Sequence, residues 1–380
     1  MTRAALIVLL LAAHGCSSGH GHGGGGGAAV IDGAFQFLTT DNLGGQDDDP
    51  AVAVDAAGNV HVVWFSDRDG TKDLYHARST SIDLATATIA WTAPVQLTNL
   101  APASFPPPTQ GDNYPSLFID GAGTFHVAWF RWNLSNECHI LYMKSDGTPA
   151  GWAAATVVNV TGGANFDRFP RVVKLASNDL RIYFGSSTRG TPGKNDIFMA
   201  QSTDDGATWG APAAVASLNT STEQSQFPHV VQVSPSSYVA TFMRWKLQPS
   251  SDFLDPTNDV FFAQSVDGTM WSVEQVTVDA PDTVNDLTPT IFFDHAGVSH
   301  LAWSTTRLGD PSADLVRIPV SDRASYPAGA QLVASAVGVA DHSPEILAIA
   351  AGGQAVFVTV WVRIVTPPNN QVGYRVSSQP

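Results

Sequence analysis

Charged residues are scarce in this sequence of 380 residues, where Asp, Glu, Lys and Arg together occupy 14% of the positions. The chain contains 33 glycines, 24 prolines and 10 tryptophans instead. A composition so poor in charge and so rich in turn-forming residues argues against a mainly helical protein and is typical of a sheet-rich fold. At this length the chain holds either two ordinary domains or one large all-β domain.

Basic residues are fewer than acidic ones, and the formal net charge is −15. This balance argues against a nucleic-acid partner and against adhesion to anionic lipid through a basic face. The acidic surplus is scattered and forms no tail, which favours a solvated surface over an acidic recognition patch.

Cysteine occurs only twice, and the first, Cys16, ends the stretch "MTRAALIVLLLAAHGC". Arg3 supplies a positive start, and residues 4–13 form an apolar run too short for a stable anchor, so we expect an export signal over 1–15. The end of this stretch resembles the bacterial lipobox, which implies lipidation of Cys16 and attachment to the cell envelope; an ordinary cleaved signal is the alternative. Residues 16–33 are then a Gly-rich tether and 34–380 the folded body. With Cys16 lipidated, no intramolecular disulfide can form, and Cys138 is expected to be a small buried residue.

The body of the chain repeats one pattern six times. It consists of Asp-x-x-Pro (Ser-x-x-Pro in the fourth copy), an apolar run, an Asp/Gly turn and a second apolar run that ends near an aromatic residue. The repeated prolines lie 55 to 65 residues apart, at Pro50, Pro115, Pro170, Pro228, Pro289 and Pro344. A unit of this length suits a four-stranded sheet.

The sixth unit stops after its third strand, whereas "FQFLTT" (residues 35–40) precedes the first unit and resembles a fourth strand. Pairing of the segment near Phe35 with the segment near Tyr374 would complete the sixth sheet and leave no open edge. We therefore predict an all-β fold, a six-bladed β-propeller whose N-terminal strand closes the last blade.

One turn, "STDDGATW", matches the Asp-box pattern Ser-x-Asp-x-Gly-x-Thr-Trp at Ser202, Asp204, Gly206, Thr208 and Trp209. Its hydroxyl and carboxylate groups are expected to bond to the turn's own backbone, with the indole packed beneath. On these residues the chain resembles the sialidase superfamily and its BNR-repeat relatives over most of residues 35–380. This resemblance implies that the turn holds a blade on the face opposite the active site, so it indicates the fold and leaves the activity open.

Carboxylates and guanidiniums are expected to meet on the other face, which the loops into the first strands share with the loops between the second and third strands. The residues are Asp47, Asp112, Asp167, Asp286 and Asp341, and Arg68, Arg131, Arg189, Arg244, Arg307 and Arg363. In one interpretation these groups pair and tie the rim together. In the other, some arginines bind an anionic ligand, as the arginine triad of sialidases does. A feature repeated in nearly every blade favours the structural interpretation for any one arginine.

Arg168 opens the sequence "RFP", which resembles the Arg-Ile-Pro motif of sialidases and implies a ligand contact. Hydrolysis of the sialidase type also needs a nucleophilic Tyr, a Glu that activates it and an Asp general acid. The candidates are Asp67, Asp69, Tyr114, Glu223 and Glu345, none of which lies in a recognisable catalytic motif. The catalytic residues therefore stay open.

Trp132 and Trp245 each follow an arginine, in "FRWN" and "MRWK". We expect them in loops, where an exposed indole suits stacking on a sugar ring, with packing into the core as the alternative. His61, His126 and His300 recur at one position of three units, and strand packing is favoured over a metal triad because equivalent positions in separate blades need not converge. No metal or cofactor site is predicted.

These patterns predict an exported, lipid-anchored propeller that binds a glycan or another anionic small ligand on the Asp/Arg rim. The alternatives are an exo-acting glycoside hydrolase of the sialidase type and a scaffold for a protein partner.

Overall fold

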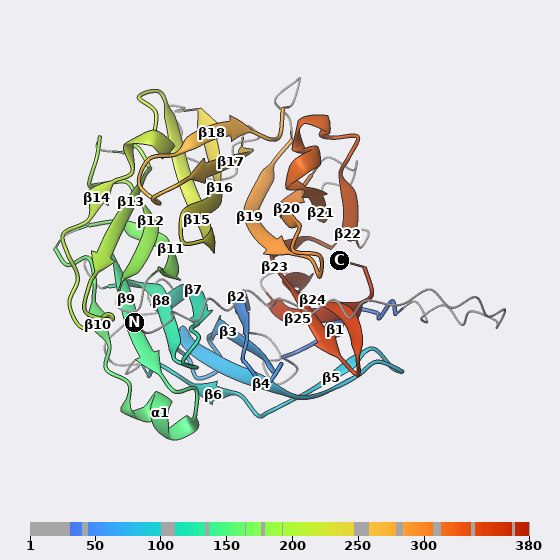
Figure 1. The fold of residues 1–380 in the computed structure, drawn as a ribbon. Helices are drawn as coiled ribbons and strands as arrows, with labels where there is room; N and C mark the ends of the chain where they lie inside the picture. Colours follow the sequence, from blue (N-terminus) through green and yellow to red (C-terminus); the bar gives the residue numbers. More distant parts are fainter. Residues whose placement is uncertain are drawn as a thin grey trace, which may run out of the picture.

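In a computed structural model, six small antiparallel sheets stand side by side in a closed ring (Figure 1). The structure describes residues 31–39, 45–99, 111–133, 137–163, 165–175, 179–191, 193–246, 258–278, 284–306, 313–335, 339–366 and 369–379. The predicted six-bladed β-propeller is confirmed. Helix in this part of the chain is confined to α1 (Pro149–Ala154) and the short 3-10 turns η2 (Ala216–Leu218) and η3 (Val320–Ser325).

Each blade is an up-and-down sheet whose first strand lies nearest the axis of the ring (Figure 1). Blades one to three are β2 (Asp47–Val54), β3 (Val60–Ser66), β4 (Asp73–Asp83), β5 (Thr88–Trp91) and β6 (Val95–Gln96); β7 (Gly111–Ile119), β8 (Phe125–Trp132), β9 (Cys138–Ser145) and β10 (Val158–Asn159); and β11 (Asp167–Lys174), β12 (Leu180–Ser186), β13 (Asp196–Ser202) and β14 (Ala213–Ala214). Blades four to six are β15 (Glu223–Ser234), β16 (Ser237–Lys246), β17 (Asp259–Ser265) and β18 (Ser272–Gln275); β19 (Asp286–Phe293), β20 (Ser299–Thr305), β21 (Asp314–Pro319) and β22 (Gln331–Ala334); and β23 (Asp341–Ala351), β24 (Gln354–Thr366) and β25 (Asn369–Ser377) with β1 (Gln36–Phe37).

The two ends of the folded body meet in the sixth blade, as predicted. Gln36 and Phe37 pair with Tyr374 and Gly373 of β25. The ring of Phe35 lies 4.7 Å from that of Trp361, so the closing strand is anchored by a side chain as well as by backbone hydrogen bonds. The pairing extends upstream to a bridge between Asp32 and Ser377, within the range expected for the tether. The expected signal segment and Cys16 lie outside the described residues.

A buried aromatic side chain near the end of the second strand fills the centre of every blade. These residues are Trp64, Trp129, Phe184, Phe242, Trp303 and Trp361, with relative exposures of 0 to 1%. Because a large aromatic residue gains most from complete burial, this repeated position explains why each unit folds around the same point.

The three repeated histidines pack within their own blades, as expected. The Nε2 atoms of His61, His126 and His300 lie 3.1 to 3.3 Å from carboxylates of Asp55, Asp120 and Asp294. Each carboxylate also accepts the backbone N–H groups of its turn, and each His Nδ1 faces the third strand, at His76, Tyr142 or Arg317. The histidines therefore join the first turn of a blade to its third strand and do not converge.

The turn from Ser202 to Trp209 closes on itself. Asp204 accepts hydrogen bonds from the hydroxyl of Ser202 at 2.8 Å and from the backbone N–H of Thr208 at 2.8 Å. The indole of Trp209 packs edge to face against Tyr142 of the neighbouring blade, with the ring centres 5.2 Å apart. Gly206 has a φ of 83°, and a Cβ there would meet the Tyr142 ring at 2.4 Å. The turn therefore braces the third blade against the second.

Two sequence-based expectations about tryptophans need correction. Trp245 was expected in a loop, but β16 continues past Phe242 and leaves this side chain 5% exposed. Trp132 was also expected in a loop, yet it ends β8, where it pairs with Gly111 and Cys138. In the first blade β4 runs on to Asp83 and forms an additional hairpin with β5. The strands are longer than the repeat suggested because the polar residues beyond each apolar run still pair with a neighbouring strand.

The two faces of the ring differ in the length of their connections. On one face β2 and β3 are joined by residues 55–59, and β15 and β16 by residues 235 and 236. On the other, β16 ends at Lys246 and β17 begins at Asp259. Since long connections carry function more often than tight hairpins, the second face is where a site is expected. None of the helices described here has both the length and the apolar content needed to cross a membrane.

Candidate functional site

All six inner strands contain the same irregular step at the repeated proline. The pairing with the second strand slips by one residue there, for example between Asp48 and Ala51 in the first blade. The residue before each proline has a φ between 48° and 57°, a left-handed conformation that side chains other than Gly adopt at a cost. A bulge of this kind re-aims side chains. Here it presents the residues before and after the proline to the axis.

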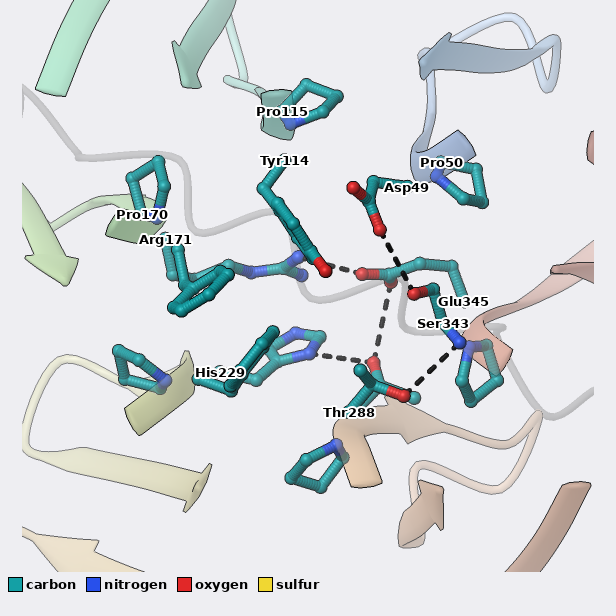
Figure 2. A pocket seen from close by; sticks show the side chains of 16 residues that line it. Asp49, Pro50, Tyr114, Pro115, Pro170, Arg171, His229, Thr288, Ser343 and Glu345 are labelled. Atoms are coloured by element: carbon teal, nitrogen blue, oxygen red, sulfur yellow. Dashed lines mark hydrogen bonds and ion pairs between the residues drawn. The ribbon is translucent and has the colours of Figure 1, made fainter. Parts of the chain in front are cut away.

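These residues line a pocket on the axis of the ring (Figure 2). The pocket encloses about 90 Å³. This is room for a few waters at roughly 30 Å³ each and well below the roughly 300–1,000 Å³ of sites that enclose a small ligand. The pocket can therefore receive only the tip of a larger molecule that lies across the face.

The residues before the prolines divide the pocket mouth into two halves. Blades two to four supply Tyr114, Phe169 and Phe227, which pack on one another. Phe169 and Phe227 stack with ring centres 3.7 Å apart, and the ring of Tyr114 meets Phe169 edge to face at 4.7 Å. One half of the mouth is thus a continuous aromatic surface, which suits the apolar face of a sugar ring.

Blades one, five and six supply Asp49, Thr288 and Ser343 to the opposite half. The hydroxyl of Ser343 donates to Asp49 Oδ1 at 3.3 Å, and its backbone N–H donates to the hydroxyl of Thr288 at 3.2 Å. Burial, and then the neighbouring carboxylate of Asp48, raise the pKa of Asp49 well above its usual range. This shift favours the protonated form of Asp49, which can donate a hydrogen bond.

Residues after the prolines form the floor of the pocket. Arg171 donates to Glu345 Oε1 at 3.1 Å, and the hydroxyl of Thr290 lies 2.7 Å from His229 Nδ1 and 3.4 Å from Glu345 Oε2 (Figure 2). Burial raises the pKa of Glu345 while Arg171 opposes the shift. Burial, and then the charge of Arg171, lower the pKa of His229 well below its usual value. The floor thus holds an ion pair beside a neutral imidazole.

Rim arginines and rim carboxylates pair within their blades. Donor–acceptor distances are 3.1 Å for Arg68–Asp47, 2.6 Å for Arg131–Asp112, 2.8 Å for Arg189–Asp167 and 2.7 Å for Arg363–Asp341. The four carboxylates are 0% exposed. Arg244, whose blade has Ser225 at that position, donates to the Ser225 hydroxyl at 3.3 Å and to the Leu218 carbonyl at 2.9 Å. These contacts support the structural interpretation, and ligand binding by these arginines stays a prediction.

The fifth blade departs from this pattern. Arg307 lies outside the described residues, and Asp286 accepts a hydrogen bond from Trp303 Nε1 at 2.9 Å. Burial raises the pKa of Asp286 to about 6.

Arg168 is the exception among the described arginines of this face. Its guanidinium lies 4.6 Å from the ring centre of Phe166 and 5.0 Å from that of Phe169. Its Nε is buried, and no hydrogen bond or ion pair joins the Arg168 side chain to another described residue. Burial lowers the pKa of this guanidinium. A desolvated cation beside two aromatic rings has the chemistry to bind an anionic group.

The candidate catalytic residues do not all come together. Tyr114 and Glu345 both line the pocket, but Asp67, Asp69 and Glu223 do not. Asp67 accepts from the Gln46 N–H at 2.7 Å, Asp69 from the Tyr75 hydroxyl, and Glu223 lies 3.7 Å from Arg244. Burial, and then the Asp49 and Asp48 charges, raise the pKa of Tyr114 well above its usual value. This shift opposes a phenolate nucleophile.

The rim tryptophans are also unlike each other. Trp132 ends β8 and meets Phe166 edge to face, with ring centres 5.1 Å apart, whereas Trp245 is buried. Trp132 is therefore the better placed of the two for a ligand.

Sequence reasoning missed most of the pocket residues. Asp49, Phe169, Arg171, Phe227, His229, Thr288, Thr290 and Ser343 flank the prolines that defined the repeat. A signal was present in the sequence, because the positions beside the repeated proline change chemistry from blade to blade and so are not required for the packing that all blades share.

One group of described residues has the donor atoms to hold a metal ion. Asp48, Asp49 and His342 place one ligand atom each within 4.8 Å of one another. Two carboxylates and an imidazole suit a divalent cation. Asn370 and Ser343 already donate hydrogen bonds to these carboxylates, so the group is also satisfied as a polar network.

No protein-family model matches the sequence, and no curated protein does. Among solved structures, an α-L-arabinanase of Penicillium chrysogenum in complex with arabinobiose has a TM-score of 0.61 at 12% identity, covering 92% of this chain and 98% of that one. An α-L-arabinofuranosidase of Fusarium graminearum has a TM-score of 0.60 at 13% identity, covering 91% and 96%. A PL25 ulvan lyase, a polysaccharide lyase, has 0.50 at 13%, covering 84% and 82%. At these identities the likeness shows the fold alone, a six-bladed β-propeller of the kind on which these carbohydrate-active proteins are built.

Proposed function

We propose that this protein binds a carbohydrate chain on the face that carries the axial pocket, with one sugar over the pocket mouth. The observation that carries the proposal is the division of the mouth into an aromatic half and a half of hydroxyl and carboxyl groups. Sugars present an apolar face and a polar edge, which such a divided surface can meet together. The arabinobiose and polysaccharide enzymes among the solved neighbours support the substrate class.

A glycan array, followed by calorimetry with arabinobiose as the first soluble probe, tests this function. We expect a Phe227→Leu variant to weaken binding about fivefold, since loss of one aromatic stacking contact removes roughly 1 kcal/mol. Met270→Ser, at an exposed position of the 3–4 turn of blade four, is the control and should bind as the wild type does. A protein that binds no glycan in either format contradicts the proposal and favours a scaffold for a protein partner.

Glycoside hydrolysis is the second candidate, because one pocket holds two carboxyl groups in different surroundings. Asp49 has no arginine or lysine at ion-pair distance among the described residues, whereas Glu345 is paired with Arg171. Burial raises the pKa of both groups, but Asp48 adds to the shift of Asp49 whereas Arg171 opposes that of Glu345. Two carboxyl groups with unequal surroundings are suited to act as general acid and as base or nucleophile. Asp49 would be the acid and Glu345 the carboxylate. Release of sugar from arabino-oligosaccharides that ceases in Asp49→Asn supports this candidate, and intact oligosaccharide after prolonged incubation removes it.

Recognition of acidic sugars, as in sialidases, is the finer proposal for this face. Its support is the Arg168 guanidinium, which lacks a described carboxylate partner, together with the Asp-box-like turn and its BNR-type context. A fluorogenic sialoside and a uronate-containing oligosaccharide distinguish turnover from binding. Arg168→Met should abolish the response to acidic sugars and leave the response to neutral ones unchanged.

We also propose that the protein is exported and held at the cell envelope through Cys16, on the strength of the N-terminal sequence. Cell fractionation of the full chain should place it with membranes. A Cys16→Ser variant that remains in the same fraction would contradict lipid anchoring.

A further inference from the structure

His229 follows the proline of β15 and reaches toward the axis of the ring (Figure 2). Its Nδ1 lies 3.4 Å from the backbone nitrogen of Ile291 and 2.7 Å from the hydroxyl of Thr290. A backbone N–H can only donate, so Nδ1 must accept and carries no proton. Because burial and the charge of Arg171 keep the pKa of this ring low, the single proton of the neutral imidazole is on Nε2.

That Nε2–H group has no hydrogen-bond partner among the described residues, although the side chain is only 5% exposed. Buried N–H groups are nearly always satisfied, so an orphaned donor in the lining of a pocket calls for an acceptor. The neighbouring polar groups do not provide one. Thr290 is engaged with Nδ1, and Glu345 is engaged by Arg171.

The charges around the pocket decide which acceptor fits. The positive charge of Arg171 is already balanced by Glu345. A second carboxylate, Asp48, lies beside Asp49 at the mouth. An added anion would be repelled by these acidic groups, and the described residues of the floor offer no unpaired cation to offset the repulsion. An uncharged oxygen avoids this repulsion.

We propose that the Nε2–H of His229 donates a hydrogen bond to an uncharged oxygen, a hydroxyl or ring oxygen, of the sugar that enters the axial pocket. The inference rests on the proposed carbohydrate-binding function and identifies a group that would hydrogen-bond to the part of the sugar inside the pocket. Thr290 acts as a positioning residue, since its hydroxyl lies 2.7 Å from Nδ1 and holds the orientation of the His229 ring, whereas the Ile291 N–H determines the tautomer. Arg168 would contact a different part of the ligand, an anionic group, because it lies beside the aromatic rings of the mouth.

Two isosteric substitutions separate the nitrogens of His229. Gln places an amide N–H near the Nε2 position. Asn reproduces the acceptor at Nδ1 and provides no donor at the Nε2 position. With arabinobiose as the probe, we expect His229→Gln to bind within about threefold of the wild type and His229→Asn about tenfold more weakly. Circular dichroism and thermal melts establish that both variants are folded. Equal affinity of wild type and His229→Asn would overturn the inference.

Nitrogen-15 NMR of the histidine-labelled protein provides a readout that a purely structural role would not move. The free protein should show His229 as the Nε2–H tautomer from pH 5 to 8, and arabinobiose should shift Nε2 more than Nδ1. Thr290→Val removes one of the two donors to Nδ1 but keeps the Ile291 N–H, so it should retain the Nε2–H tautomer and weaken binding by a smaller factor than His229→Asn. A free protein with a charged or Nδ1-protonated His229 overturns the inference. Arabinobiose binding that leaves the Nε2 chemical shift unchanged also overturns the inference, but it leaves the proposed function intact. Failure of the wild type to bind any arrayed glycan overturns both the inference and the proposed function.

Discussion

The guanidinium of Arg171 and the carboxylate of Glu345 meet 3.1 Å apart at the axis of the ring, although 174 residues separate them in the chain. The pair joins the third blade to the sixth across the centre. Its members are 17% and 15% exposed, so each charge depends on the other for solvation.

Removal of one member should therefore cost more than removal of both. We expect Arg171→Met to lower the free energy of unfolding by about 3–5 kcal/mol, because Glu345 is left buried without its cation. The loss should be largest at pH 8 and shrink as the pH falls toward the unfolded pKa of Glu, since the stranded group folds most readily when protonated. Urea unfolding at pH 5 and pH 8 measures this. The double variant Arg171→Met/Glu345→Met should recover most of the stability, and a double variant as unstable as the single one would contradict the explanation.

Arg168 should respond in the opposite way to the paired arginines. Arg168→Met removes a desolvated charge with no described acidic partner, so we expect the free energy of unfolding to change by less than about 1 kcal/mol. Arg189→Met is the matched comparison, because it strands Asp167, which is 0% exposed, and should cost about 3 kcal/mol. Chemical denaturation of the two variants under the same conditions provides the contrast, and equal losses would show that Arg168 has a structural partner after all.

Ring closure depends on the side chain of Phe35. The phenyl ring lies against Trp361 and 4.2 Å from the guanidinium carbon of Arg363, so Phe35→Ala should lower stability by roughly 2–3 kcal/mol, somewhat less than for a fully buried Phe. Phe37, which is 40% exposed, is the control, and Phe37→Ala should cost well under half as much. Thermal melts report the difference, and hydrogen exchange at β25 should accelerate only in the Phe35 variant. Protection of β25 that survives Phe35→Ala would argue that the backbone pairing alone holds the ring.

Acid should weaken the first blade through His76. The imidazoles of His61 and His76 approach to 2.9 Å, with His76 4% exposed. Burial, and then the neighbouring His61, lower the pKa of His76 to about 3. The unfolded state then binds a proton below about pH 6.5 that the folded state refuses, so stability is complete above that pH and is lost as the pH falls toward 3.

Between pH 7.5 and pH 5 this linkage corresponds to about 2 kcal/mol. Urea midpoints across this range should fall in the wild type and fall less in His76→Gln, which cannot be protonated. Parallel pH profiles of the two proteins would assign the acid sensitivity to other groups.

The fold could be read from the sequence because its determinants repeat. Two features recur in every unit, the spaced proline and the aromatic residue at the end of the second apolar run. The absence of a fourth strand from the sixth unit stands out against this repeat. The Asp–Arg rim was visible for the same reason. These repeated residues are the ones that hold each blade together, as the pairing of Arg131 with Asp112 illustrates.

The pocket could not be read in this way because its residues vary from blade to blade, with only Phe169 and Phe227 alike before the proline. Asp49, Tyr114 and Phe227 occupy one structural position, yet a comparison of the repeats finds nothing in common among them. Their convergence depends on a left-handed residue before each proline, a conformation that no local sequence preference predicted, since residues before proline favour extended backbone. Trp245 was misplaced for a simpler reason: the strand did not end at its aromatic residue.

The bulge beside each proline turns a few residues of the inner strand toward the central opening, while the rest of the strand packs between neighbouring sheets. The residues on either side of the proline point into the central opening, and their chemistry varies between blades that share the same buried aromatic centre. The ring therefore offers two variable positions per blade on a common frame. Specificity could be rebuilt around the circumference, provided that residues in contact with each other, such as Arg171 and Glu345 or Phe169 and Phe227, change together.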